Sequence, residues 1–231
     1  MGVRLVLWDI DGTLVDTAGH GATAFADAFR AVFGRPPEGM VPMAGRTDHE
    51  IALAILERSS VTDGESHLPA MWRELATALN GKQQVIRDDG RALPGAEAVL
   101  QELSRREGVL QSLLTGNIEA NAATKLGAFG LDRWLDLGIG GYGSDGGVRS
   151  GLVEVALGRA RELRGVELTP ADVVLVGDTP LDVAAGHAAG VRVVAVASGY
   201  SSEDDLRAAG PDLVLEDLRD TEAAVEAILA A

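Results

Sequence analysis

The sequence predicts an α/β fold: a doubly wound, Rossmann-like parallel sheet as the core, with an all-helical cap domain inserted into it. Short apolar runs rich in Val and Leu alternate with segments of helical periodicity, which is the pattern of βαβ units. The apolar runs lack polar alternation, as is typical of strands that are covered on both faces. One long stretch between the first two runs shows helical patterns only, and this stretch is the predicted insertion.

The first predicted strand is Val3–Trp8, which ends in the segment Asp9-Ile10-Asp11-Gly12-Thr13. Further strands are expected after the insertion, at Val109–Leu114, Leu135–Ile139, Val173–Val176, Val191–Val196 and Leu213–Leu215. Helices of the core are expected at Ala96–Arg106, Asn117–Phe129, Gly151–Arg164, Asp182–Ala189 and Thr221–Ala231. In such sheets ligands bind beyond the carboxyl ends of the strands, so we expect the site there.

The predicted cap domain spans residues 18–87, which leaves 1–17 and 88–231 as the core domain. Its three expected helices are Ala22–Phe33, Asp48–Arg58 and Ser66–Leu79. The prolines at 36, 37 and 42 mark loops between them. The chain is expected to return to the core near Pro94-Gly95.

Composition excludes several classes of function. The 231 residues include no cysteine, which rules out disulfides, thiolate catalysis and zinc–thiolate sites. The formal net charge of −15 argues against a nucleic-acid partner, because phosphate backbones need a basic face. No run of 18 apolar residues is present, so no membrane span is expected. A cytoplasmic protein, monomeric or homodimeric, is the simplest expectation.

Paired acidic residues follow the first and fourth core strands of the sheet. Two carboxylates 4 Å apart repel by roughly 4 kcal/mol at an effective dielectric constant near 20, unless a cation or a proton lies between them. Oxygen ligands of this kind suit Mg²⁺. We therefore predict a magnesium site at Asp9, Asp11, Asp178 and Asp182, the alternative being a simple polar turn after the strand.

Four segments resemble the haloacid dehalogenase superfamily, on the branch of phosphoglycolate-phosphatase-like hydrolases with a helical cap. The segments are "DIDGTLVDT", "LLTGN", "VVLVGDTPLDVAAGHAAG" and, at the return from cap to core, "RALPGAEAVLQEL". Most members of this superfamily transfer phosphoryl groups. The resemblance implies a nucleophilic Asp9 that forms an aspartyl-phosphate, and an Asp11 that acts as general acid and base. Asp11 would also offer its backbone carbonyl to the metal.

The resemblance assigns the remaining site residues as well. Asp178 would complete the metal ligands, and Asp182 would ligate the metal or orient its ligands. Thr115, Gly116 and Asn117 would hold the oxygens of the phosphate.

One position departs from the family pattern. The family places a lysine after the third strand, beside the nucleophile, and this sequence has Arg149 there, which can grip phosphate with two donors. Lys125 is the alternative cation, although a solvated position on its helix is favoured. The glycine-rich segment "GIGGYG" is interpreted as a loop that brings Arg149 to the site, because no helix pattern follows it directly.

In the cap, the segment "AGRTDHE" suggests Arg46 as a substrate contact. In the same segment Thr47 and Glu50 have the spacing of a capping box at the start of a helix.

The expected function is that of a Mg²⁺-dependent phosphatase acting on a small phosphorylated metabolite. A sugar phosphomutase would share every core residue. A haloacid dehalogenase is disfavoured because that branch generally lacks an acid at the position of Asp11. A phospho-binding protein without catalysis is the alternative outside the enzymes. The sequence does not separate phosphoglycolate from a sugar phosphate, a nucleoside monophosphate or pyrophosphate.

Overall fold

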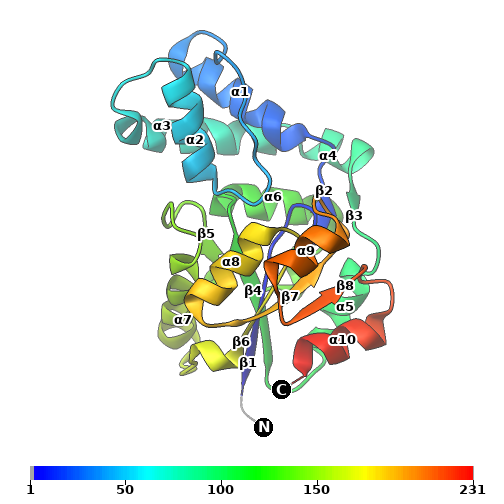
Figure 1. Cartoon of the computed structure of the whole chain (residues 1–231). Coiled ribbons are helices and arrows are strands. Elements are labelled where there is room, and N and C mark those ends of the chain that lie inside the picture. Colours follow the sequence, from blue (N-terminus) through cyan, green and yellow to red (C-terminus); the bar gives the residue numbers. More distant parts are fainter. Residues whose placement is uncertain (1–2, 231) are drawn as a thin grey trace.

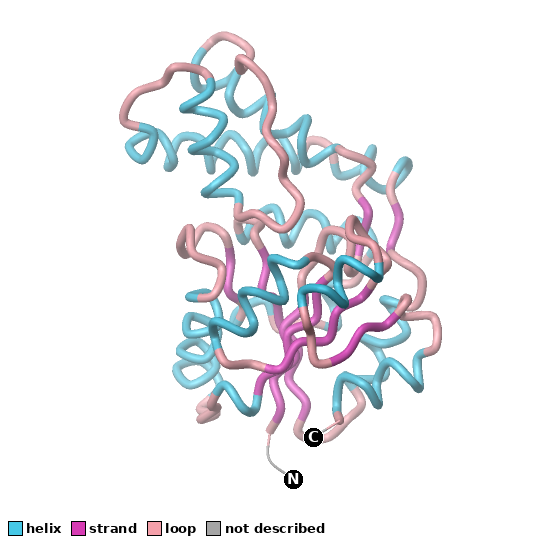
Figure 2. The backbone as a smooth tube through the Cα atoms, viewed as in Figure 1, coloured by secondary structure: helices cyan, strands magenta, loops and turns pink. Residues whose placement is uncertain are grey.

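A six-stranded sheet lies at the centre of the computed structural model, which describes residues 3–230 (Figures 1 and 2). All strand pairs in this sheet are parallel, in the order β5-β4-β1-β6-β7-β8. The strands are β1 (Arg4–Trp8), β4 (Val109–Thr115), β5 (Gly141–Tyr142), β6 (Val173–Gly177), β7 (Arg192–Val196) and β8 (Leu213–Leu215). The predicted doubly wound α/β fold is confirmed.

The register of the three central strands brings their ends together. Trp8 of β1 lies opposite Leu113 of β4 on one side and Val176 of β6 on the other. Because the strands are parallel, the residues that follow each of them emerge at the same edge of the sheet. Asp9 and Asp178 therefore come close together although the sequence separates them widely.

Helices cover both faces of the sheet, as the continuous apolar runs require. On β1, Val6 and Trp8 pack into one apolar cluster, and Leu5 and Leu7 into another on the opposite face. The first face is covered by α5 (Ala96–Ser104), α6 (Glu119–Phe129) and α10 (Thr221–Leu229). The second is covered by α7 (Gly151–Arg164), α8 (Pro180–Ala189) and α9 (Glu203–Ala209). No helix within residues 3–230 has the length and apolar character needed to cross a bilayer.

Four helices form a group beyond the carboxyl edge of the sheet, at the top of Figure 1. This helical unit consists of α1 (His20–Phe33), α2 (Asp48–Arg58), α3 (Gly64–Asn80) and α4 (Gln83–Asp89). Its buried side chains form an apolar cluster of their own, which α6 of the core joins through Ile118 and Ala128. The chain enters the unit through β2 (Val15–Asp16) and leaves it through β3 (Arg91–Ala92), and these two strands pair antiparallel.

Several element predictions are wrong in position. Leu135–Ile139 is not a strand, because Asp136 accepts the N–H of Gly138 on its side chain and starts a 3₁₀ turn there. The edge strand β5 begins only at Gly141. The sequence analysis also missed α4 and α9, which have only seven residues each. Residues 1 and 2 of the predicted core domain, and Ala231 of the predicted last helix, lie outside the described residues.

Candidate active site

Three buried carboxylates gather at the carboxyl edge of the sheet. Asp9 follows β1, Asp178 follows β6, and Asp182 lies in the first turn of α8. Each offers one oxygen, and these oxygens lie within 4.8 Å of one another. Burial raises the pKa of Asp178 well above the usual carboxyl range, and the charges of Asp9 and Asp182 raise it further. The arrangement concentrates negative charge at buried positions.

Local structure fixes two of these acids. Asp182 completes a capping box at the start of α8, where its Oδ2 accepts the N–H and the hydroxyl of Thr179. Asp178 accepts the hydroxyl of Thr13 on Oδ1 and the N–H of Tyr200 on Oδ2. Gly12 lies so close that a Cβ there would be 2.3 Å from Oδ2 of Asp178, and its φ of +87° also favours glycine. Glycine therefore allows the sharp turn that the chain makes after β1.

Arg149 supplies a cation directly beside the cluster. Its Nη2 donates to Oδ1 of Asp9 at 2.7 Å and also to Oδ1 of Asp182, while Nη1 donates to the carbonyl of Gly45. Burial lowers the pKa of Arg149, but the carboxylates of Asp182 and Asp9 raise it more, so the guanidinium stays charged. The sequence prediction that Arg149 reaches the site is consistent with this geometry.

The glycine-rich segment 138–143 belongs to the stretch of chain that leads to Arg149. No helix opens directly after it, since α7 begins at Gly151. Gly143 donates its N–H to the carbonyl of Asn117, which ties the segment to the loop that follows β4.

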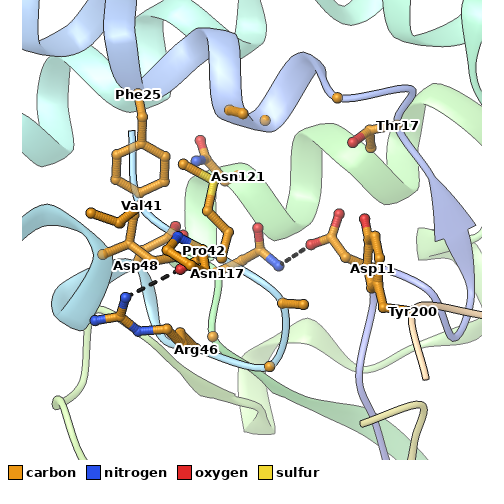
Figure 3. A pocket seen from close by; sticks show the side chains of 18 of the residues that line it. Asp11, Thr17, Phe25, Val41, Pro42, Arg46, Asp48, Asn117, Asn121 and Tyr200 are labelled. Carbon is orange, nitrogen blue, oxygen red and sulfur yellow. Dashed lines mark hydrogen bonds between the residues drawn. The ribbon is translucent and has the colours of Figure 1, made fainter. Parts of the chain in front are cut away.

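Asp11 is turned away from the three-carboxylate cluster. Its Oδ2 accepts two hydrogen bonds, one from Nδ2 of Asn117 at 2.8 Å (Figure 3) and one from Nζ of Lys125 at 2.5 Å. Lys125 is only 5% exposed, so the expectation of a solvated helix residue is wrong. The reason is the charge of Asp11, together with that of the buried Asp48 nearby, which allows the ammonium to be buried.

The loop after β4 contacts both the core and the helical unit. Oγ1 of Thr115 accepts Nδ2 of Asn117 at 2.9 Å, so Asn117 connects Thr115 to Asp11. A Cβ at Gly116 would lie 2.2 Å from the carbonyl oxygen of Arg46, which leaves no room for a side chain. The N–H of Asp48 donates to the carbonyl of Gly116, and Oδ2 of Asp48 accepts the N–H of Ile118.

Arg46 lines the cavity, but its guanidinium is not directed at the acids. It donates to the carbonyl of Pro42 in its own loop (Figure 3) and to the carbonyl of Glu50 in α2. The capping box predicted for Thr47 and Glu50 is present at the start of α2.

A cavity of about 460 Å³ lies between the helical unit and the core. Its core side includes Asp9, Asp11, Asn117, Lys125 and Arg149. On the side of the helical unit it is lined by Phe25, Val41 and Asp48 (Figure 3), together with Met43 and Ile51. One wall of the cavity is thus polar and charged, and the other is mostly apolar.

Asp48 and Asn121 are cavity residues that the sequence analysis missed, and Lys125 is one that it named only as the alternative cation. A spacing of four residues relates Asn117, Asn121 and Lys125, and on a helix this places them on one face. That periodicity is the sequence feature that could have identified Asn121 and Lys125, whereas it does not bear on Asp48.

Comparison with known proteins agrees with this geometry. The family model of haloacid dehalogenase-like hydrolases matches residues 3–190. This chain belongs to that family. Phosphoglycolate phosphatase 1 of Pseudomonas aeruginosa is 32% identical over 220 residues, which are 94% of this chain and 78% of the relative. The plasmid phosphoglycolate phosphatase of Cupriavidus necator is 32% identical over 92% of this chain and 89% of its own.

Solved structures show the same fold. A hydrolase from Pseudomonas syringae superposes with a TM-score of 0.69 at 21% identity, over 97% of this chain and 99% of the other. Because the superposition covers nearly the whole chain, the structural similarity of this haloacid dehalogenase-like hydrolase includes the helical unit as well as the core.

The donor set of this hydrolase fits a divalent metal. Asp9, Asp178 and Asp182 offer carboxylate oxygens, which are the ligands that Mg²⁺ prefers. Burial raises the pKa of Asp9, Arg149 lowers it, and the neighbouring acids Asp182 and Asp11 raise it again. Its pKa stays above the usual range, so the guanidinium alone does not neutralise the cluster. A bound cation would relieve the remaining repulsion.

Proposed function

We propose that this hydrolase is a magnesium-dependent phosphatase that cleaves a small phosphorylated metabolite through an aspartyl-phosphate on Asp9. The observation that carries the proposal is the buried cluster of Asp9, Asp178 and Asp182. Arg149 bridges Asp9 and Asp182, and both Arg149 and Asp9 line a cavity. Relatives that carry the name phosphoglycolate phosphatase support the same reaction class.

In the first half of the reaction a carboxylate oxygen of Asp9 attacks the phosphorus of the ester. The bond between phosphorus and the ester oxygen breaks, and Asp11 donates a proton to that oxygen, which leaves as an alcohol. Arg149, Thr115 and the N–H groups of the loop after β4 stabilise the charge on the phosphoryl oxygens.

In the second half a water molecule attacks the phosphorus of the aspartyl-phosphate. Asp11, now ionised, takes the proton of this water, and the acyl phosphate bond breaks. Inorganic phosphate and the carboxylate of Asp9 are the products, and Asp11 returns to its protonated form.

The metal would be held by Asp9, Asp178 and the backbone carbonyl of Asp11, with Asp182 orienting the site through its capping contacts. When bound, Mg²⁺ offsets the negative charge of the carboxylates and of the phosphate. Arg149 donates to Asp9 and to Asp182, and through these contacts it would keep the attacking carboxylate in place.

We further propose that residues 18–87 act as a cap that closes over the substrate. The cavity lies between this part and the core, and its volume suits a small ester rather than a polymer. The N–H of Asp48 and its carboxylate fasten the cap to the loop after β4 in the conformation described here. Arg46 remains a proposed substrate contact, and its guanidinium would first have to give up the hydrogen bond to the carbonyl of Pro42.

A screen of phosphate esters tests the proposal. Phosphoglycolate, sugar phosphates and nucleoside monophosphates are incubated with the wild type and with Asp9→Asn, and the release of phosphate is measured with Mg²⁺ and with a chelator. We expect release from at least one ester, lost both with the chelator and in the variant. Isomerisation of a sugar phosphate without phosphate release would instead indicate a mutase. Equal release by Asp9→Asn would contradict the assignment of the nucleophile.

A further inference from the structure

Lys125 is a buried cation that the reaction described above leaves without a role. It lies on α6, is 5% exposed, and lines the cavity beside Asp11 and Asp48. The chain contains two lysines, and the other, Lys82, pairs with Asp27 at the surface of the helical unit. Burying an ammonium is costly unless a carboxylate compensates it, so the partner of Lys125 indicates what it does.

That partner is the acid proposed for proton transfer. Nζ of Lys125 lies 2.5 Å from Oδ2 of Asp11, and Nδ2 of Asn117 donates to the same oxygen at 2.8 Å (Figure 3). Among the described residues, hydrogen bonds reach the Asp11 carboxylate only at Oδ2. Two donors on one oxygen fix the rotation of the carboxylate and leave Oδ1 free.

Because both donors reach Oδ2, the two carboxylate oxygens of Asp11 differ in how well they can carry a proton. A proton on Oδ2 would face two N–H donors and would break at least one of these hydrogen bonds. A proton on Oδ1 leaves both intact. Both donors belong to the segment that follows β4, so they are held by the same part of the core that is proposed to bind the phosphate.

We infer that Lys125 is a positioning residue, which holds Asp11 so that Oδ1 gives and takes the transferred proton. The inference rests on the proposed function, because it concerns the proton transfer of that reaction. Lys125 pairs with Asp11 and Arg149 pairs with Asp9, so these two cations have different tasks.

A purely structural role and a positioning role of Lys125 predict different effects of its loss on the cleavage of esters with different leaving groups. The oxygen of an alkyl phosphate needs a proton as it leaves, whereas 4-nitrophenolate leaves readily without one. Loss of a correctly placed Oδ1 therefore slows cleavage of the alkyl ester more than cleavage of the aryl ester. A general loss of folded or active protein slows both equally.

The experiment compares kcat/KM for 4-nitrophenyl phosphate and glycerol 2-phosphate in the wild type, Lys125→Met and the control Lys82→Met. For Lys125→Met we expect a loss of about 100-fold or more with the alkyl ester, the range of general acid catalysis, and of less than about fivefold with the aryl ester. Lys82→Met should change neither value by more than about twofold. Similar losses with both esters, or no loss with either, would overturn the inference.

A second variant keeps the test informative if Lys125→Met folds poorly. Lys125→Ala leaves a space that opens to the cavity, so added ethylammonium can replace the missing group. We expect it to restore the alkyl ester activity in a saturable manner. A folded Lys125→Ala, verified by its unfolding midpoint, that shows the selective loss but no rescue would contradict a role of the ammonium itself. If the wild type releases phosphate from neither of these esters and from none of the esters in the screen above, the proposed function fails and the inference with it; if only esters of the screen are cleaved, the best of them replaces glycerol 2-phosphate as the alkyl ester and its phenyl counterpart is the aryl ester.

Discussion

Nη2 of Arg149 lies 2.7 Å from Oδ1 of Asp9, although 140 positions separate the two residues in the sequence. The same nitrogen contacts Asp182, so one buried guanidinium joins the end of β1 to the first turn of α8. The family pattern has a lysine at this place. A guanidinium keeps the charge there and adds a fork of donors, which suits a site with two carboxylates and a phosphate.

Loss of Arg149 is expected to impair catalysis strongly. Arg149→Met removes the donor beside Asp9, and we expect kcat/KM for phosphate release to fall about 100-fold or more, as for other charge-stabilising donors. Arg149→Lys should retain part of the activity, because it keeps the charge but not the fork. Arg161→Met, at an exposed position of α7, is the matched control. An unchanged rate in Arg149→Met would remove this residue from the site.

Metal binding should stabilise the fold more at high pH than at low pH. The pKa values of Asp9 and Asp178 are raised mainly by burial, so these carboxylates hold protons that a metal must displace. The displacement becomes easier as the pH rises. We expect Mg²⁺ to increase the midpoint of thermal unfolding more at about pH 8 than at about pH 6. An equal increase at both pH values would contradict metal binding at these acids.

Asp48 should make the stability of the protein depend on pH. Burial raises its pKa to about 6, although the charge of Lys125 lowers it. A folded pKa above the unfolded value means that the folded state binds more protons, so the free energy of unfolding falls as the pH rises through about 4 to 6. The decrease is on the order of 1–3 kcal/mol.

The variant Asp48→Asn isolates this effect, because the amide oxygen can still accept the N–H of Ile118. Urea unfolding at several pH values should show the variant gaining stability relative to the wild type as the pH rises through that window. A constant difference between the two proteins would show that Asp48 titrates normally.

Gly116 is expected to tolerate no side chain. A Cβ there would lie 2.2 Å from the carbonyl oxygen of Arg46, and this backbone cannot move without pulling the start of α2 from the core. We expect Gly116→Ala to lower the free energy of unfolding by about 1–3 kcal/mol and to raise KM. Gly158→Ala on α7, where a Cβ meets no atom within 4 Å, is the control and should be neutral or stabilising. Equal stability of both variants would contradict the close packing at Gly116.

The sequence was sufficient to predict the parallel sheet and the clustering of its strand ends, because the apolar runs that precede Asp9, Thr115 and Asp178 are local features. It placed a strand at Leu135–Ile139, where the side chain of Asp136 starts a 3₁₀ turn, and so it missed β5, which begins at Gly141. Local patterns also cannot show which acid a cation faces.

Lys125 illustrates this limit. On its own helix it is one polar residue among several, and its burial depends on Asp11 and Asp48, which come from two other parts of the chain. Arg46 is the opposite case. Its sequence motif suggests a substrate contact, but its guanidinium donates to the carbonyls of Pro42 and Glu50 instead. Such choices depend on three-dimensional contacts between distant segments.

The central claim is that Asp9 attacks the phosphorus. The most direct measurement is an acid quench of a single turnover with Mg²⁺, followed by mass spectrometry of the peptides. We predict a phosphoryl group on the peptide that contains Asp9, absent when Asp9→Asn is used. A phosphoryl group on another residue, or wild-type phosphate release with no modified peptide at any time, would contradict the account.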